Sequence, residues 1–336
     1  MLDIEQIKKI DKKEMYSVYN NWPQIANESY RNQNSDFEIK NISQIIFVGM
    51  GGSGAIHDLF GSILSDSKIH INIVKGYHLP KAVNKNSLIV VTSVSGNTIE
   101  TLTVLDEAVK LNLNVIGFSS GGKMEKYCMK NQINYRKIPM YHSPRTSFPS
   151  FLYSMLKILK PIIPFTENEI LESIKNLKLL QEKISTQNLT SSNPSLELAY
   201  WIKETPVIYY PWGLHSVAVR FKNSIQENAK SHAMVEDIIE ASHNGIVPWE
   251  KICSLQPILI RGNEDYIKTK ERWEIIKEFF SSLNIEYKEI FSSDGNILTK
   301  IVNLIYLLDF ATVYKAIILG IDPTPVKSIE FVKKRS

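Results

Sequence analysis

Short apolar runs and apolar residues at helical spacing alternate along most of this chain. The runs 45–48, 88–91 and 115–118 contain no charged or strongly polar residue, as in parallel strands that are buried on both faces. Helical apolar spacing follows each run, and glycine and proline turns separate the segments. The alternation predicts an α/β fold in which helices cover parallel sheets on both faces.

The alternation occurs in two blocks of similar plan, which predicts two domains. A proline-containing segment, 161–169, separates the blocks. The predicted parts are an N-terminal helical arm, a first α/β domain, and a second α/β domain with a C-terminal helix and tail, at 1–30, 31–162 and 163–336. In the second block we expect helices at 215–228, 233–242 and 296–318.

A hydroxyl-rich turn lies between the run 88–91 and a helical pattern that begins near Ile99. Ser93, Ser95 and Thr98 stand in this turn with one glycine. The N-terminus of a helix exposes unpaired N–H groups and carries roughly half a positive charge. Hydroxyl donors added to that end form a cage for a phosphate group. The alternative is an ordinary helix cap, which needs only one hydroxyl.

A glycine turn follows the first predicted strand. Residues 49–54 (GMGGSG) fit the G-x-G-x-x-G pattern of dinucleotide-binding folds. That interpretation also needs an acidic residue at the end of the second strand, and the segment 69–76 contains none. In the other interpretation the glycines let the backbone approach a sugar, and Ser53 donates a hydrogen bond to it.

Candidate acid–base residues lie mostly in the second half of the chain. Glu227 comes at the C-terminal end of an apolar helical pattern, where the helix dipole is expected to raise the pKa of a carboxylate. A proton-abstracting base needs that property. Arg145, His243 and Lys333 stand in short polar segments, and each also fits an ordinary surface residue.

Taken together, these motifs resemble a known family. Residues 93–101 match the S-x-S-G-N-T-x-E-T loop of the sugar isomerase (SIS) fold over nine consecutive positions. The chain resembles the archaeal bifunctional phosphoglucose/phosphomannose isomerases along nearly its whole length. The segments that carry this wider resemblance are 49–54, 93–101, 144–145, 226–230, 242–244 and 320–326.

The resemblance implies two SIS-type domains and an aldose–ketose isomerase of glycolysis and gluconeogenesis. It implies that glucose 6-phosphate and mannose 6-phosphate are interconverted with fructose 6-phosphate by ring opening and proton transfer through a cis-enediol. Glu227 would be the base, and Arg145 would stabilise the enediolate. His243, donated by the other subunit, and Lys333, or the adjacent Lys334, would open the ring. The implied substrate-binding residues are Gly52, Ser53, Ser93, Ser95, Thr98, Arg145, His243 and Lys333.

Composition agrees with a globular protein of the cytoplasm. The 336 residues are 43% hydrophobic and 22% charged, with a formal net charge of +4. The charges are interspersed, so we expect no nucleic-acid partner. The two cysteines are far apart and lack metal-ligand spacing, which suits a reducing compartment. The apolar stretch 151–165 is too short to span a bilayer, and no signal peptide is expected.

The expected partners are sugar phosphates and a second copy of the chain, in a homodimer with shared active sites. The chemistry requires no cofactor and no metal. Two alternatives stand beside this interpretation. A non-catalytic sugar-phosphate sensor would carry a DNA-binding helix-turn-helix, and an aminosugar-phosphate isomerase would carry a glutaminase domain with an N-terminal cysteine; neither is seen in the sequence.

Overall fold

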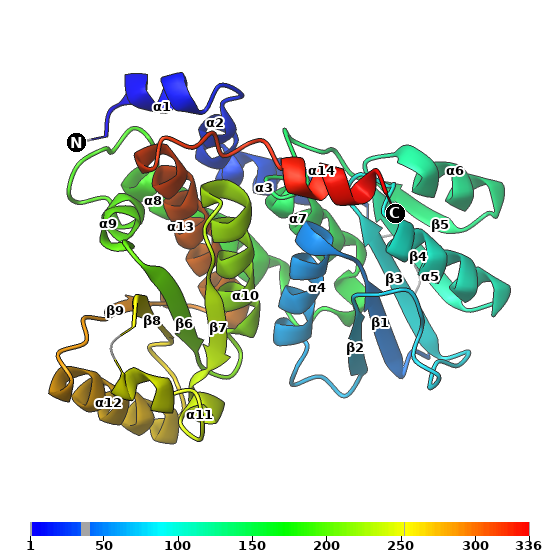
Figure 1. Ribbon diagram of the computed structural model, residues 1–336. Helices are drawn as coiled ribbons and strands as arrows, with labels where there is room; N and C mark the ends of the chain where they lie inside the picture. The colour runs from blue at the N-terminus through cyan, green and yellow to red at the C-terminus, as the bar shows by residue number, and fades with distance from the viewer. Residues whose placement is uncertain (1, 35–40, 252, 336) are drawn as a thin grey trace. The chain divides into compact units, whose positions relative to one another are not determined.

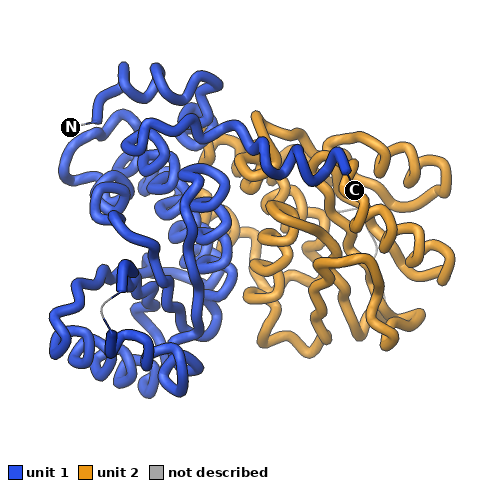
Figure 2. Tube along the Cα trace, in the orientation of Figure 1, with its two compact units in different colours: residues 1–20, 175–336 blue, residues 21–174 orange. Residues whose placement is uncertain are grey.

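The computed structural model describes residues 2–34, 41–251 and 253–335. They form two compact units, shown in Figure 2. Unit 1 comprises residues 1–20 and 175–336, and unit 2 comprises residues 21–174. The division falls within helix α8 (Glu167–Ile184), whereas the sequence pattern placed a boundary at 162/163. The N-terminal helices are shared between the two units.

Unit 2 is built on a five-stranded parallel sheet in the order β2-β1-β3-β4-β5. The strands are β1 (Gln44–Val48), β2 (His70–Val74), β3 (Ser87–Ser93), β4 (Asn114–Ser119) and β5 (Asn134–Lys137). Strands β1 and β3 are buried along their whole length, as expected of apolar runs covered on both faces. Val48 pairs with both Val74 and Val91, so the carboxyl ends of the central strands share one edge.

Helices cover this sheet on both faces (Figure 1). On one face, α5 and α6 pack Val104 and Met124 against strand residues such as Val91. On the other face, the ring of Phe47 stacks on that of Phe60 in α4, with centroids 5.1 Å apart. The helices that begin in unit 2 are α3 (Trp22–Arg31), α4 (Gly51–Ile63), α5 (Ile99–Lys110), α6 (Gly122–Lys130), α7 (Phe148–Ile158), η1 (Lys160–Ile162) and α8.

Unit 1 contains a four-stranded parallel sheet in the order β7-β6-β8-β9. The strands are β6 (Thr205–Tyr210), β7 (Met234–Asp237), β8 (Leu255–Arg261) and β9 (Lys288–Phe291). The other elements are α1 (Ile4–Ile10), α2 (Met15–Asn20), α9 (Pro194–Trp201), α10 (His215–Ser224), η2 (Ile225–Ala229), α11 (Ile238–Ala241), η3 (Val247–Glu250), α12 (Ile267–Ser282), α13 (Ile297–Ile318) and α14 (Lys327–Lys333). Two parallel sheets with flanking helices confirm the predicted α/β class.

The longest helix, α13, is the core of unit 1. It has 22 residues and is apolar enough to cross a membrane, but 83% of its apolar window is buried inside the protein. The sequence pattern predicted a helix at 296–318 but took 151–165 as the most apolar stretch of the chain. Its burial accounts for its apolar composition, because a helix that is hydrophobic all round belongs to a core or a bilayer.

One predicted helix is wrong. Residues 233–242 were expected to form a single helix, but strand β7 occupies the first part and only α11 is helical. The carboxylate of Asp237 accepts hydrogen bonds from the N–H groups of Ile239 and Glu240, which starts α11 at that point. Strand β7 is a short edge strand in which no residue is buried, so it lacks the apolar run that would predict a strand.

Burial of His57 on α4 makes the stability of the protein sensitive to acid. The side chain is completely buried, and its Nε2 lies 2.9 Å from Thr92 Oγ1. Burial, and then the charge of Lys75, lower the pKa of His57 to about 3. The folded-state pKa lies below the unfolded value of about 6.5. The contribution of His57 is therefore fully present above about pH 6.5 and is lost as the pH falls toward about 3.

We expect His57→Gln to remove part of this acid sensitivity. Between about pH 7 and pH 5, the wild-type free energy of unfolding should fall by about 2 kcal/mol more than that of the variant, at about 1.4 kcal/mol per pH unit below about 6.5. Urea unfolding at both pH values measures the difference. His78→Gln, at an exposed histidine of the same unit, should keep the wild-type pH dependence. Equal pH dependence in wild type and His57→Gln would contradict the assignment.

Candidate functional site

The hydroxyl-rich turn of unit 2 joins β3 to α5 at the carboxyl edge of the sheet. Thr98 is the N-cap residue of α5, yet its side chain makes no capping hydrogen bond. Its hydroxyl lies instead 2.9 Å from that of Ser93. The first N–H groups of a helix have no acceptor within the helix, so this end of α5 suits an anion. An ordinary capped helix would direct the N-cap hydroxyl to those groups.

The turn is held in place by the neighbouring turn between β4 and α6. The N–H of Ser120 donates to Val94 O at 3.0 Å, and the N–H of Met124 donates to Gly96 O at 2.9 Å. Gly96 has a φ of +68°, and a Cβ there would lie 1.8 Å from Gly121 O. Only glycine fits this position. The sequence analysis missed the supporting turn, although residues 119–122 (SSGG) mark it at the end of the next strand.

Ser95 and Asn97 are joined by local bonds within the turn. The N–H of Asn97 donates to Ser95 Oγ at 3.3 Å, and the Asn97 side-chain amide donates to Ser95 O at 2.9 Å. Asn97 Oδ1 also accepts from the N–H of Lys123 at 3.1 Å. Asn97 therefore shapes the turn, and the half-buried Ser95 keeps its own O–H as a donor.

The glycine turn after β1 lies against the same site. Ser53 is 5% exposed, and its Oγ accepts from the N–H of Val94 at 3.2 Å, which leaves its O–H as a donor. A Cβ on Gly52 would lie 3.4 Å from Pro144 O and 3.6 Å from Arg145 Cα. The structure thus brings the predicted residues of unit 2 together at one sheet edge. They are Gly52, Ser53, Ser93, Ser95, Thr98 and Arg145.

The end of β2 does not fit a dinucleotide site. Lys75 follows this strand, and its Nζ lies 2.6 Å from Asp58 Oδ2 of α4. A dinucleotide-binding fold needs a carboxylate at this point to accept the ribose hydroxyls. A lysine that is already paired does not supply that acceptor. Among the residues that the structure describes, no group of three or more His, Cys, Asp or Glu side chains could hold a metal ion.

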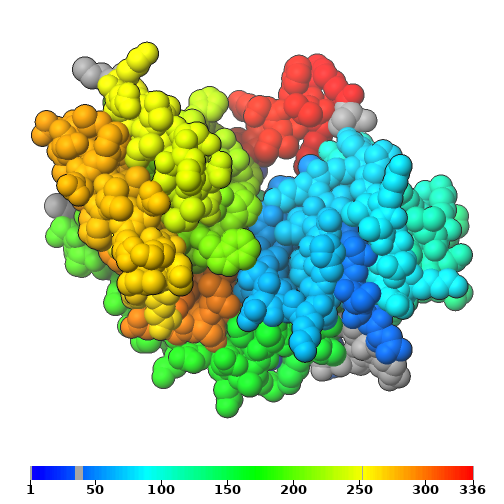
Figure 3. Space-filling view, turned by 90° about the horizontal axis from the view of Figure 1, so that it is seen from below, coloured from blue at the N-terminus to red at the C-terminus, as the bar shows by residue number. Residues whose placement is uncertain are grey.

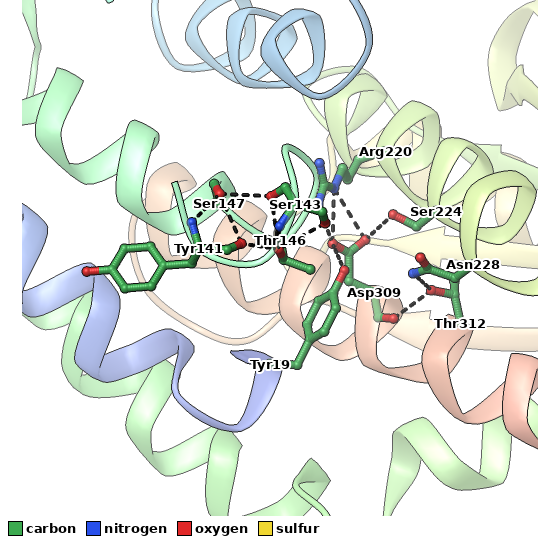
Figure 4. Close-up of polar contacts among 10 residues, drawn as sticks. All are labelled: Tyr19, Tyr141, Ser143, Thr146, Ser147, Arg220, Ser224, Asn228, Asp309 and Thr312. Carbon is green, nitrogen blue, oxygen red and sulfur yellow. Dashed lines mark hydrogen bonds and ion pairs between the residues drawn. The ribbon is translucent and has the colours of Figure 1, made fainter. Parts of the chain in front are cut away.

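Arg145 is buried. Hydroxyl groups of its neighbours Thr146 and Ser147 stabilise the turn that contains it, as Figure 4 shows. Thr146 Oγ1 donates to Tyr141 O at 2.5 Å, and Ser147 Oγ donates to Ser143 O at 2.8 Å. These bonds fix the chain just before α7 begins. With 5% of its surface exposed, Arg145 does not behave as the ordinary surface arginine that the sequence also allowed.

Glu227, in unit 1, lies in a turn of π-helix that continues α10. The sequence predicted one continuous α-helix at 215–228, whereas in the structure α10 ends at Ser224 and a π-turn follows. Such turns within helices are frequent at functional sites. Lys230 ends the turn with a φ of +55°. Its Nζ donates to the carbonyl oxygens of Glu227 and, at 2.9 Å, of Pro323.

A buried polar cluster anchors α10 and the π-turn to α13 (Figure 4). Arg220 Nη2 lies 2.6 Å from Asp309 Oδ2, and Ser224 Oγ donates to Asp309 Oδ1 at 2.6 Å. One turn further on, the amide of Asn228 donates to Thr312 Oγ1 at 2.8 Å. The cluster fixes the backbone on both sides of Glu227 along the sequence.

Arg220 interacts electrostatically with Asp309 and also with Glu227 in the π-turn. Burial alone would lower the pKa of Arg220, but the Asp309 carboxylate raises it above its usual value, and the charge of Glu227 acts in the same direction. The sequence analysis missed Arg220 and Asp309 as a pair. The available signal was a single aspartate inside the apolar helix 297–318, since a buried carboxylate needs a partner.

His243 and Lys333 are exposed residues of unit 1. His243 comes just after α11, where its N–H donates to Glu240 O at 2.9 Å. Lys333 ends α14, which is red in Figure 3 and lies at the surface. Lys334, the alternative to Lys333, follows directly and is also exposed. These residues and Glu227 belong to unit 1, and the hydroxyl-rich turn belongs to unit 2.

Comparison with known proteins finds relatives of similar length. Residues 191–335 match the family described as the bacterial phospho-glucose isomerase C-terminal SIS domain. Over 331 residues the chain is 30% identical to a bifunctional phosphoglucose/phosphomannose isomerase of Caldicellulosiruptor bescii, covering 95% of this chain and 97% of the relative. It is 26% identical over 325 residues to a D-glucosamine-6-phosphate 4-epimerase of Sulfolobus acidocaldarius, and the alignment covers 96% of this chain and 98% of the relative.

A solved structure shows the same fold. A glucose-6-phosphate isomerase like protein from Thermus thermophilus aligns with a TM-score of 0.69 at 15% identity, covering 100% of both chains. Together with the matched family, this likeness confirms the predicted SIS-type fold.

The tight fit of Gly96 leads to a prediction about anion binding by the hydroxyl-rich turn. Gly96→Ala should destabilise the protein and weaken binding of inorganic phosphate, because the new Cβ would collide with Gly121 O. Gly320→Ala is the matched control, since Gly320 has a φ of +70° and nothing within 4 Å of its Cβ position. The control should lose about 1–2 kcal/mol from backbone strain and bind phosphate normally. Thermal unfolding and calorimetry measure both, and equal phosphate affinity in the two variants would count against the turn as the anion site.

Proposed function

This chain belongs to the family of bifunctional phosphoglucose/phosphomannose isomerases, and we propose that it interconverts glucose 6-phosphate and mannose 6-phosphate with fructose 6-phosphate. The observation that carries the proposal is the turn between β3 and α5, whose hydroxyls and helix N-terminus suit a phosphate. A sugar phosphate held there has its sugar beside the glycine turn, because Ser53 bonds directly to this turn.

Glu227 is the proposed base for both substrates. Aldose–ketose interconversion moves one proton between C2 and C1. Glu227 takes the C2 proton from the open-chain aldose, a cis-enediol forms as O1 is protonated, and the same carboxyl returns the proton to C1 as the C2 hydroxyl loses its proton to give the ketone. The two aldoses differ only at C2 and share the enediol, so one base serves both. Arg145 is proposed to stabilise the negative charge that develops on the oxygen.

Ring opening is assigned to His243 and Lys333. It needs one group that removes the proton of the C1 hydroxyl and one that protonates the ring oxygen. We assign these roles to the pair and place His243 in the active site of a second copy, in a homodimer. Support comes from its exposed position on a short loop. Lys334 is the alternative to Lys333.

We also propose a cellular compartment and a metabolic role for this protein. We place the protein in the cytoplasm, in glycolysis and gluconeogenesis. Its two cysteines, Cys128 and Cys253, are free thiols, which agrees with a reducing compartment.

Two alternatives use the same phosphate-binding turn. A non-catalytic sensor would bind fructose 6-phosphate without turnover. An aminosugar-phosphate enzyme would act on glucosamine 6-phosphate instead, and the likeness to a D-glucosamine-6-phosphate 4-epimerase makes this the second candidate.

The deciding experiment incubates the protein separately with fructose 6-phosphate and glucosamine 6-phosphate and analyses all products. Formation of glucose 6-phosphate and mannose 6-phosphate supports the proposal, and turnover of the aminosugar alone supports the second candidate.

Glu227→Gln should fold normally and lose both isomerase activities together, because one base serves both. We expect a fall of about 10²–10⁴-fold in kcat, as for removal of a general base. Glu250→Gln, at an exposed glutamate of the same unit, should keep wild-type rates. Coupled assays for each aldose product measure the losses, and circular dichroism checks the fold. Loss of only one activity would show that Glu227 is not the shared base.

Ser95→Ala and Thr98→Ala should mainly raise KM, since each removes one hydrogen bond to a charged phosphate. Such a bond contributes about 1.5–3 kcal/mol, or about ten- to a hundred-fold in KM. The control is Thr103→Ala on the same helix, whose exposed hydroxyl donates to Ile99 O at 2.9 Å. Steady-state kinetics with fructose 6-phosphate measure the effect. If both variants lost thermal stability but kept KM, the turn would be an ordinary helix cap.

A further inference from the structure

Unit 1 has a cavity at the carboxyl edge of its own sheet. Its volume is about 230 Å³, and the segments that follow β6, β8 and β9 line it. Ligands of open α/β sheets bind at this edge. The volume is below the range of about 300–1,000 Å³ that is usual for larger ligands, so the cavity has the size for a monosaccharide.

The cavity lies at the same point of the topology as the phosphate-binding turn of unit 2. Four strands of each sheet follow one order, in which the unit's first strand lies between its second and third: β2-β1-β3-β4 and β7-β6-β8-β9. Residues 211–214 after β6 therefore correspond to the glycine turn. Residues 262–266 after β8 correspond to the phosphate-binding turn.

The chemistry at this point differs from that of unit 2. The segment 262–266 reads GNEDY and carries two carboxylates in place of hydroxyls. Glu264 pairs with Lys300, and Asp265 accepts from the N–H of Gly262 at 3.1 Å. The helix that follows β8, α12, has no side-chain cap at its N-cap residue Tyr266, whereas the N-terminus of α13 is capped by Asn296. The two carboxylates disfavour a phosphate, and a carboxylate accepts hydrogen bonds from sugar hydroxyls.

Two further observations point to a ligand. Trp212 and Tyr266 line the cavity and are 82% and 71% exposed, and large exposed aromatics suit the apolar face of a sugar ring. Ser292 also lines the cavity and is 3% exposed, yet its hydroxyl has no hydrogen-bond partner in the described part of the chain. A buried hydroxyl without a partner is costly unless a ligand satisfies it.

We propose that this cavity is a second binding site, which takes an unphosphorylated monosaccharide. Trp212 and Tyr266 contact the ring, and the carboxylate of Asp265 and the hydroxyl of Ser292 bond to its hydroxyl groups. None of the catalytic residues proposed above lines this cavity, and its existence does not depend on the isomerase activity.

The test uses D-glucose as the probe and saturation-transfer NMR on the intact protein. We expect a Kd on the order of 1–10 mM, as for a small neutral ligand, that saturating glucose 6-phosphate does not change. Trp212→Ala should weaken binding at least about ten-fold. Tyr77→Ala is the control, since Tyr77 is an aromatic residue of unit 2 that is 47% exposed, and it should bind as wild type does.

Ser292→Ala separates a binding role from a structural one. It should weaken glucose binding about ten-fold, the effect of one hydrogen bond, without lowering the thermal midpoint, because its hydroxyl has no partner to lose among the residues described. Three results would overturn the proposal: no glucose binding at tens of millimolar, displacement of glucose by glucose 6-phosphate, or unchanged binding in Trp212→Ala. Because the readout is binding, these results are distinguishable from a failure of the isomerase assay.

Discussion

The buried ion pair between Arg220 and Asp309 is the interaction on which the architecture of unit 1 depends. Their side chains are 3% and 0% exposed. Removing one partner of such a pair typically costs about 3–5 kcal/mol, because the other charge is left buried and unpaired. Ser224 donates to the same carboxylate, and the hydroxyl of Tyr19 lies 3.4 Å from it. The pair thus joins α2, α10 and α13, and the π-turn with Glu227 follows directly from this junction.

Unit 2 positions its candidate site by hydrogen bonds between turns. The turn after β3 is bound on one side by Ser53 and on the other by Ser120 and Met124. These bonds hold the backbone of the turn in place, so binding of a phosphate there, as proposed, would lose less conformational entropy. The two units repeat one strand order but fix their polar residues by different means, hydrogen-bonded turns in one and a buried ion pair in the other.

How far the sequence predicted each element depended on how local its signal was. The strands around 88–91 and 115–118 were predicted from their apolar runs. The hydroxyl-rich turn was predicted because its residues are contiguous in the sequence. Strand β7 gave no such signal, because a short edge strand needs few apolar residues. The π-turn was missed because its anchors, Asp309 and Thr312, lie more than eighty residues away along the chain. A pattern read along one helix contains no information about such partners.

By itself the sequence determined the α/β class, the parallel sheets and the position of the hydroxyl-rich turn, because each depends on residues that are close along the chain. Only the tertiary structure decided that Arg145 is buried, that α13 is a core helix, and that Ser292 lacks a partner within the described chain. The physical reason is that apolar periodicity shows which face of an element is covered but not what covers it. Charge pairing and burial are settled by contacts between segments that the chain separates widely.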